Sequence, residues 1–429
     1  MRYHALALIL AVAVPAIVQA APIYNYLDIQ PRTATKATTP LDRGYDALNA
    51  KQFSEASRLF QEAAKEDPKD PLPMLGLADV ARLQNKDTDA SNWVKKAFEV
   101  APQSLPALVA MGRLSLAKKQ WGDAERYFLE ATRVSPNAVA PQLDLGELYL
   151  NVLHKPGPAV DAFRKASELK PDHAGARFGL GMALLAKQNP AEAATSLAEA
   201  TRLAPDNPLA FFGLGQAEAA RGDSRAAARA FDRAIALDPK FSAAMIQGAE
   251  AKRATGDMSG ALALIDQAAG LEPGSSQVRF KQGLMHHVAG DPAGAFSGYA
   301  AAMKADPKLP LPFNNAAALA AERKERLDEA LVWAKKACAL APNEVTFLDT
   351  LAAVHRARGE RSEAVRILEK IAASEKPPAD SLYQLGLLRQ EAGQSKEAVQ
   401  AYRRALQTDP SFAGARDAKS RIDQLEPKR

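Results

Sequence analysis

The chain of 429 residues contains a single cysteine, Cys338, so it cannot form an internal disulfide bond. An oxidising compartment permits disulfides but does not require them, because a chain of this length can be stabilised by buried apolar surface alone. Cys338 lies in an alanine-rich stretch. We therefore expect its thiol to be a small buried side chain and not a reactive group.

Long apolar runs and blocks of basic residues are also missing from most of the chain. After the first twenty residues, no stretch approaches the roughly 18 consecutive apolar residues of a membrane-spanning helix. The 55 Lys and Arg residues are interspersed with 50 Asp and Glu residues, for a formal net charge of +5. Interspersed charge is typical of solvated helices, so we expect neither a nucleic-acid partner nor a transmembrane span in the mature chain.

The first twenty residues have the pattern of a secretory signal peptide. Arg2 precedes an unbroken apolar run from Ala5 to Val14, and Val18-Gln19-Ala20 is a small-x-small cleavage pattern. This arrangement predicts residues 1–20 as a signal peptide that is cleaved after Ala20, or else kept as an anchor. Residues 21–39 are expected to be a leader or tether, because their second half is rich in threonine. The predicted location is the periplasm or cell envelope.

The most regular feature of the remaining chain is an alanine that recurs every 34 or 35 residues. A proline follows 12 residues after nearly every one of these alanines, as at Pro205 and Pro239. A period of this length is typical of a solenoid of helix–turn–helix units. The recurring alanines are Ala56, Ala90, Ala124, Ala159, Ala193, Ala227, Ala261, Ala295, Ala330, Ala364 and Ala398.

One unit, from Pro205 to Pro239, shows how each repeat is expected to fold. A first helix, here named helix A, is predicted over 209–220, and Gly222 suits the left-handed residue that ends it. A second helix, helix B, is predicted over 225–237 and stops before Pro239. Small residues such as Ala227 allow the two helices to approach closely, and large ones such as Phe231 fill the space between them.

This pattern of small, large and proline positions resembles the tetratricopeptide repeat (TPR) family over residues 40–410. The resemblance implies an all-α, right-handed α-solenoid of about eleven helix–turn–helix repeats, whose concave groove is lined by helix A. Residues 411–429 would form a capping helix and tail, which solenoids need for solubility. Three places depart from the pattern. An extra residue near 153–158 should lengthen one inter-helix turn, residues 323–326 should lengthen another, and the closing proline of the tenth unit is displaced at 374–378.

Two columns of helix A residues are candidates for binding a partner in the groove. The first column is apolar from Leu41 to Phe280, and polar residues are frequent in the second, four positions further on. Such a surface suits a helix or an extended segment with regularly spaced apolar side chains, although the same residues could simply pack helix A against its neighbours. The predicted groove residues are Leu143, Phe178, Met182, Phe212, Gln216, Ile246, Glu250 and Phe280.

No catalytic, cofactor-binding or metal-binding residues are predicted. Gly179-Leu180-Gly181 imitates half of a dinucleotide-binding loop, but it lies inside a predicted helix with no strand before it, so repeat packing explains it. His286 and His287 are consecutive, so on a helix they point about 100° apart and would not bind one metal ion together. The second column contains no asparagine between Tyr45 and Leu284, which argues against a clamp for a C-terminal carboxylate.

These observations predict a non-catalytic protein–protein interaction scaffold of a bacterial cell envelope. Its partner would be a peptide or helical segment held in the groove, during assembly of a pilus, a secretion system or a polysaccharide-export machine. Two alternatives stay open: a regulator that recruits a separate envelope enzyme, for example in glycan synthesis, and an inert structural spacer. The choice of process rests on analogy, because a fold does not fix a function.

Overall fold

The computed structural model describes residues 39–426, and these residues are almost entirely helical. They form twenty-three α-helices and one π-helix, and no strand occurs among them. The all-α solenoid fold expected from the repeat is therefore confirmed for this part of the chain. The predicted signal peptide and nearly all of the predicted leader lie outside the described residues, so these two assignments stay predictions.

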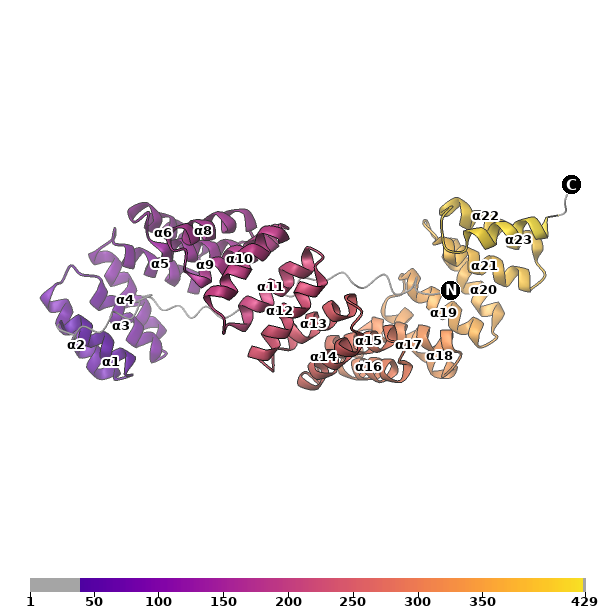
Figure 1. The fold of residues 1–429 in the computed structure, drawn as a ribbon, viewed down its shortest axis with the longest axis horizontal. Coiled ribbons are helices and arrows are strands. Elements are labelled where there is room, and N and C mark those ends of the chain that lie inside the picture. The colour runs from indigo at the N-terminus through magenta and orange to yellow at the C-terminus, as the bar shows by residue number, and fades with distance from the viewer. Residues whose placement is uncertain (1–38, 427–429) are drawn as a thin grey trace. The chain divides into compact units, whose positions relative to one another are not determined.

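The described chain divides into two compact units, residues 39–239 and 240–426. The first unit contains twelve α-helices and the π-helix (Figure 1). Its helices are α1 Pro40–Asn49, α2 Phe53–Glu66, α3 Leu72–Leu83, α4 Asp87–Val100, α5 Leu105–Ala117, α6 Trp121–Val134, α7 Val139–Glu147, η1 Leu148–Val152, α8 Pro156–Leu169, α9 Ala174–Ala186, α10 Pro190–Leu203, α11 Pro208–Ala220 and α12 Ser224–Leu237.

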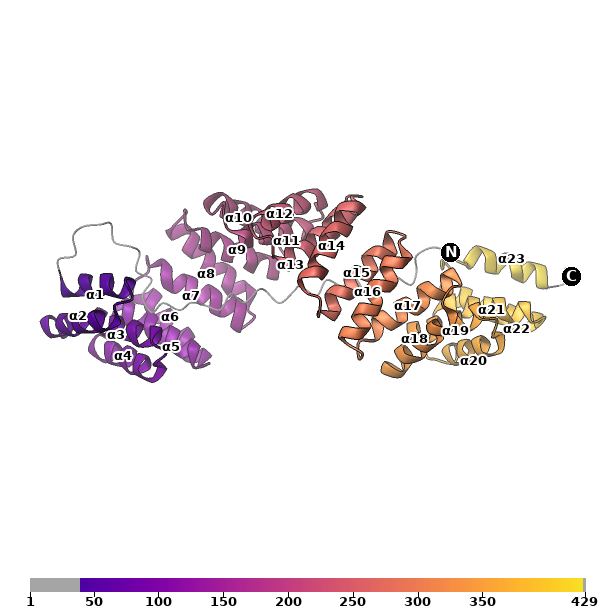
Figure 2. The ribbon, with the colours of Figure 1, turned by 90° about the horizontal axis from the view of Figure 1, so that it is seen from below.

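The second unit repeats the same arrangement of paired helices and ends with one unpaired helix (Figure 2). Its helices are α13 Ser242–Ala254, α14 Met258–Leu271, α15 Ser276–Val288, α16 Pro292–Ala305, α17 Pro310–Arg323, α18 Leu327–Leu340, α19 Val345–Ala357, α20 Arg361–Ala372, α21 Ala379–Glu391, α22 Ser395–Thr408 and α23 Ala415–Leu425.

Odd-numbered helices up to α21 are helix A of their repeats, and even-numbered helices are helix B. Within the first unit, every helix packs against the next in sequence, and successive helices A also contact each other from α1 to α11. Helices B of the first unit make at most marginal contact with one another. Helices in the inner layer of a curved stack lie closer together than helices in the outer layer. The helix A layer is therefore the concave side of the first unit.

The turn between helix A and helix B has a left-handed residue in every repeat. Gly222, with φ of 90°, follows α11 as predicted, and Lys119, with φ of 58°, occupies the same place after α5. Only glycine adopts this region without steric cost, so repeats with lysine, asparagine or glutamine there contain some strain. Asp223 then caps α12 by accepting a hydrogen bond from the backbone N–H of Ala226 at 2.9 Å.

Close contact between a glycine of helix A and a large side chain of helix B recurs in many of the repeats. A Cβ added to Gly146 in α7 would lie 2.7 Å from the Phe163 ring of α8, and one added to Gly179 in α9 would lie 2.4 Å from the same ring. Phe163 thus fits between two helices A of consecutive repeats. This contact confirms that packing, and not a cofactor loop, accounts for Gly179-Leu180-Gly181, since Gly181 receives Leu197 in the same way.

The extra residue of the fourth repeat lies inside helix A and not in the turn where it was expected. Helix α7 ends at Glu147, and residues Leu148–Val152 continue as the π-helix η1. A π-helical turn accommodates one more residue than an α-helical turn, so the insertion widens the helix and leaves the repeat register intact. The longer turn predicted for the ninth repeat is wrong: the extra residue lies in α17, which has 14 residues against 13 in α15, and the turn before α18 is as short as in the other repeats. This turn differs in conformation, because both Lys324 and Arg326 adopt positive φ angles.

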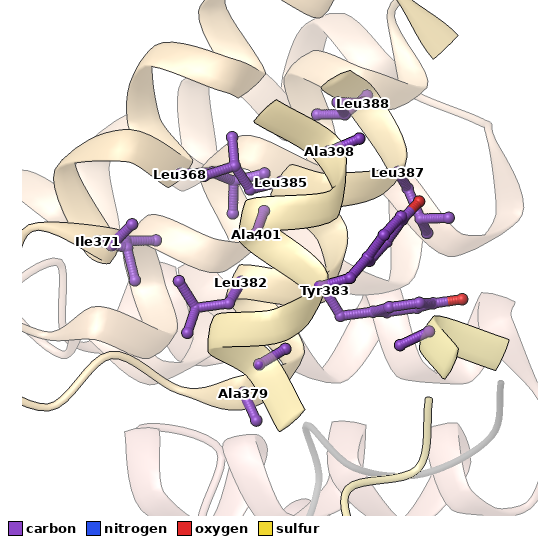
Figure 3. Packing of buried hydrophobic residues seen from close by; sticks show 14 of the residues in the cluster. Leu368, Ile371, Ala379, Leu382, Tyr383, Leu385, Leu387, Leu388, Ala398 and Ala401 are labelled. Atoms are coloured by element: carbon purple, nitrogen blue, oxygen red, sulfur yellow. The ribbon is translucent and has the colours of Figure 1, made fainter. Parts of the chain in front are cut away.

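A well-packed core closes the C-terminal end of the second unit. Leu368 and Ile371 of α20 face Leu382 and Leu385 of α21 (Figure 3). Helix α23 covers this core, but it begins at Ala415 and not at the expected Ser411. Phe412, just before α23, lies against the ring of Tyr383, with a centroid separation of 5.5 Å.

Candidate functional site

The candidate site is the exposed side of the helix A layer, described by two columns of residues. The first column contains one residue from each helix A. Its members are Leu41, Leu75, Val109, Leu143, Phe178, Phe212, Ile246, Phe280, Asn314, Asp349 and Tyr383. The second column lies four residues further along the same helices and runs from Tyr45 to Leu284. Residues four apart lie on one face of a helix, so the two columns share a face.

Leu143, Phe178 and Met182 are brought together in the first unit. All three belong to, or pack on, the hydrophobic cluster between α7 and α11. Met182 is buried, whereas Leu143 and Phe178 are half-buried and keep part of their apolar surface exposed. The Phe178 ring also reaches α11, where a Cβ added to Gly213 would lie 3.3 Å from it. Within the first unit, these two half-buried side chains are the predicted first-column residues that a partner can contact.

Phe212 and Phe280 contribute mainly to the core. Each side chain is 7% exposed. The Phe212 ring lies 5.8 Å from Phe231 of α12, and the Phe280 ring lies 5.9 Å from Tyr299 of α16. Because each ring packs on helix B of its own repeat, replacing it would disturb folding before it affected any partner.

The other predicted residues are polar or lie in the second unit. Gln216, in the first unit, is half-buried. Ile246 and Glu250, on α13, are half-buried too, and Glu250 accepts a hydrogen bond from Arg253 Nε at 2.9 Å. Five of the eight residues thus belong to the first unit and three to the second. Their action as one continuous groove stays a prediction.

Two charged residues of the second column are buried. Asp79 is 5% exposed and Arg113 is 7% exposed. The Nε atom of Arg113, on α5, lies 3.1 Å from Oδ2 of Asp144 on α7, and Asp144 is buried as well. This ion pair joins helices A of consecutive repeats beneath the first column. The distribution of charges in the sequence did not by itself predict this ion pair. Its two residues are 31 positions apart, close to one repeat length, and this spacing could have indicated a contact between consecutive repeats.

A half-buried carboxyl group, Asp349 on α19, lies in the first column of the second unit. Its Oδ2 accepts a hydrogen bond from the Ser381 hydroxyl of α21 at 2.8 Å. Burial raises the pKa of Asp349 to about 6, the Ser381 hydroxyl opposes this shift, and the like charge of Asp380 adds to it. The repeat register places Asp349 in the first column, but nothing in the sequence assigns it a role.

Comparisons with known proteins identify the family. Three sequence models described as tetratricopeptide repeat match the chain: the first at residues 153–208, 180–240 and 246–310, the second at 47–114, and the third at 379–412. The chain belongs to the tetratricopeptide repeat family. TPR proteins are generally non-catalytic interaction scaffolds, which is consistent with the repeat packing described above.

Several solved TPR structures are similar to parts or most of this chain. YrrB, a TPR protein with an unusual peptide-binding site, is 25% identical over 43% of this chain and 95% of its own, with a TM-score of 0.37. PilW, a type IV pilus biogenesis factor, is 18% identical over 47% of this chain and 94% of its own, with a TM-score of 0.43. Yeast Tom70 is 15% identical over 90% of this chain and 94% of its own, with a TM-score of 0.40.

His286 and His287 of this TPR protein make structural contacts. His286 lies between two carboxylates, with Nδ1 at 2.8 Å from Asp291 and Nε2 at 3.0 Å from Asp266. Although burial lowers the pKa of His286, the two carboxylates raise it more, so the net shift is upward. His287 points instead toward Tyr299, with Nδ1 3.1 Å from the hydroxyl. The prediction that the two rings diverge is confirmed.

Other chemistry is limited among residues 39–426. No group of three or more His, Cys, Asp or Glu side chains in this range could hold a metal ion. Cys338 is half-buried and not fully buried as expected, and burial raises the pKa of its thiol, which disfavours the reactive thiolate. Within the same range, every helix is too short or too polar to cross a membrane.

Proposed function

We propose that this TPR protein is a non-catalytic scaffold that binds segments of partner proteins on the concave helix A side of its repeats. The observation that supports this proposal is the first column of the first unit, which is apolar in all six repeats yet leaves Leu143 and Phe178 half-exposed. A core position would bury these side chains completely. A partner segment with regularly spaced apolar residues would remove the remaining apolar surface from water.

We further propose that the scaffold acts in a bacterial cell envelope, after export directed by residues 1–20. The process would be assembly of a pilus, a secretion system or a polysaccharide exporter. The support for export is the apolar run from Ala5 to Val14 and the small residues before position 21. Mass determination of the protein isolated from an envelope fraction should give a chain that begins at Ala21. A chain beginning at Met1 in the cytoplasm would refute the proposed location.

The binding face is tested by site-specific photo-crosslinking. A benzoyl-phenylalanine at Phe178 replaces one aromatic ring by another on the concave side. The matched control carries the same group at Leu129, which is 47% exposed on helix B of the same unit. We expect a discrete crosslinked partner from position 178 and none from position 129. Equal yields at both positions, or no crosslink at 178 or 143, would favour an inert spacer.

The identity of the captured protein separates the scaffold from the enzyme recruiter. A structural subunit of an envelope machine supports the scaffold. A catalytic partner whose turnover changes when the purified TPR protein is added supports recruitment of an enzyme instead.

A further inference from the structure

The first column changes character in the last repeats of the second unit. In repeats one to eight every residue of the column is apolar, but repeats nine and ten supply Asn314 on α17 and Asp349 on α19. Helices α17 and α19 contact each other, and the Ser381–Asp349 hydrogen bond joins α19 to α21. The repeat register therefore places Asn314, Asp349 and the start of α21 next to one another along the column.

Asp349 is a largely buried carboxyl group that has no cationic partner. Among the described residues, the hydroxyl of Ser381 is the one hydrogen-bond donor to its carboxylate. Of the charged side chains on the helices packed around it, α17, α18, α20 and α21, the one whose charge acts on Asp349 is Asp380, which has the same sign. Arg356, two turns further along α19, donates instead to Gln384 at 2.5 Å and to Glu391 at 3.3 Å.

Asn314 presents a second acceptor that is left without a donor. Its side chain is 6% exposed, and its Oδ1 atom has no hydrogen-bond partner. A chain of hydrogen bonds fixes this orientation. Burial raises the pKa of Tyr299, and the Asn315 amide lowers it, as expected for an N–H group that donates to the hydroxyl. The Oδ1 of Asn315 then accepts from Asn314 Nδ2 at 3.3 Å, which leaves Asn314 Oδ1 as the unsatisfied end.

His287 completes the other end of this chain. Burial lowers the pKa of His287, so its ring is neutral near pH 7 and its Nδ1 can accept the Tyr299 hydroxyl proton at 3.1 Å. A buried carbonyl oxygen without a donor costs about 1–3 kcal/mol, so its persistence at this position needs an explanation.

We propose that Asn314, Asp349 and Asp380 form a subsite for the cationic side chain, lysine or arginine, of a partner polypeptide. An ammonium or guanidinium group would donate to the unpaired Asn314 oxygen and to Asp349, and it would relieve the repulsion between the two carboxylates. An apolar side chain would satisfy none of these groups, and an anion would be repelled. This inference rests on the proposed function, because it names the chemistry of one contact on the helix A side.

The test measures binding of fluorescein-labelled hexalysine to the purified mature chain by fluorescence anisotropy. At about pH 7.5 and 0.15 M salt, we expect D349N to bind about tenfold more weakly than the unaltered protein. N314L, which restores the leucine found in other repeats, should also weaken binding by several-fold. The control E397Q removes an exposed carboxylate from α22 of the same unit and should stay within about twofold.

The dependence on pH gives a readout that a general charge effect would not produce. Because burial raises the pKa of Asp349 to about 6, hexalysine should bind less tightly as the pH falls toward 5, and this loss should be much smaller in D349N. Equal affinity of D349N and the unaltered protein would overturn the proposal. An equal loss in E397Q would also overturn it, because binding would then follow net charge.

Two further arms identify the source of the cation. Hexa-acetyl-lysine, which lacks the charge, should not bind. Spermidine that competes as well as hexalysine would identify a free polyamine as the ligand and refute a polypeptide partner. The crosslinking from Phe178 tests the first unit independently. A crosslinked partner together with unchanged D349N binding would therefore refute this subsite while leaving the proposed function standing.

Discussion

Asp144 in the first unit is a buried carboxyl group on helix A and Asp349 in the second is a half-buried one, and their surroundings differ. Asp144 lies 3.1 Å from the guanidinium Nε of Arg113 on the preceding helix A. Asp349 receives one serine hydroxyl, and its charged neighbour Asp380 has the same sign. A paired buried charge holds neighbouring helices in register, whereas an unpaired one makes the fold less stable and is retained for binding in the present proposal.

The rest of the column supports this contrast. In the first unit the column residues are all apolar, and each helix A contacts the next. In the second unit, α17 and α19 are the one pair of successive helices A that contact each other as closely as those of the first unit. The polar residues of the column begin on these two helices. The two units are therefore built from the same kind of repeat but present different side chains to a partner. The first presents an apolar strip, and the second presents an end rich in acidic residues and hydrogen-bond acceptors.

The largest expected effect comes from breaking the buried pair. Arg113→Leu would leave Asp144 charged and buried without its arginine, so we expect the first unit to lose about 3–5 kcal/mol of unfolding free energy. Differential scanning calorimetry of the full chain should show a lower melting temperature for one transition. Arg133→Leu removes an arginine from an exposed pair with Glu130 and should leave the melting temperature nearly unchanged. Similar effects of the two substitutions would show that Arg113 is not a buried structural cation.

A smaller loss of stability is expected when alanine replaces a packed glycine of helix A, and it should be similar in the two units because both use this packing. A Cβ at Gly112 would lie 2.3 Å from the Phe128 ring, and one at Gly386 would lie 2.5 Å from Tyr402. Gly112→Ala and Gly386→Ala should each destabilise their own unit by about 1–3 kcal/mol through overpacking.

The controls for this pair are glycines whose added Cβ meets nothing within 4 Å. Gly122 in α6 and Gly270 in α14 meet this condition, one in each unit. Gly122→Ala and Gly270→Ala should stabilise their helices by up to about 1 kcal/mol, because alanine loses less backbone entropy than glycine on folding. Chemical denaturation followed by circular dichroism measures all four variants. Stabilisation by Gly112→Ala would mean that the ring of Phe128 moves away without cost.

Most of the fold could be predicted from the sequence because the same pattern of residues recurs in all eleven repeats. The period fixed the helix pairs, and the small and large positions fixed which residues meet, as with Gly146 and Phe163. The position of the extra residue in the fourth repeat could not be predicted. A π-helical turn and a longer loop absorb one residue equally well, and packing around Leu148 and Leu150, both buried, decides between them.

The candidate site was less predictable, because a register position does not determine how deeply a side chain is buried. Phe178 and Phe212 occupy the same position in adjacent repeats, yet the first is half-buried and the second is 7% exposed. The difference depends on neighbouring side chains from other repeats. The burial of Arg113 could not be predicted for the same reason, since its partner Asp144 lies in the next repeat.

The last prediction is a substitution that raises stability, whereas the first, Arg113→Leu, lowers it. The pKa of Asp349 is raised to about 6 in the folded protein, from an ordinary value near 3.8. The folded state therefore binds a proton more tightly than the unfolded state does, and stability falls as the pH rises from about 4 to 6. Above that window the ionised Asp349 costs on the order of 1–3 kcal/mol. Asp349→Asn cannot ionise and can still accept from Ser381, so it should be more stable than the unaltered protein at about pH 8.

The difference between the two proteins should shrink as the pH falls and disappear near pH 4, where Asp349 is protonated. Thermal unfolding at several pH values measures it. Asp144→Asn is the matched comparison, because it removes the carboxylate that Arg113 needs and should destabilise the first unit at pH 8. If Asp349→Asn is also destabilising at pH 8, Asp349 has a favourable partner in the folded chain. The contrast between a carboxyl group that holds the fold together and one retained for a cation would then be lost.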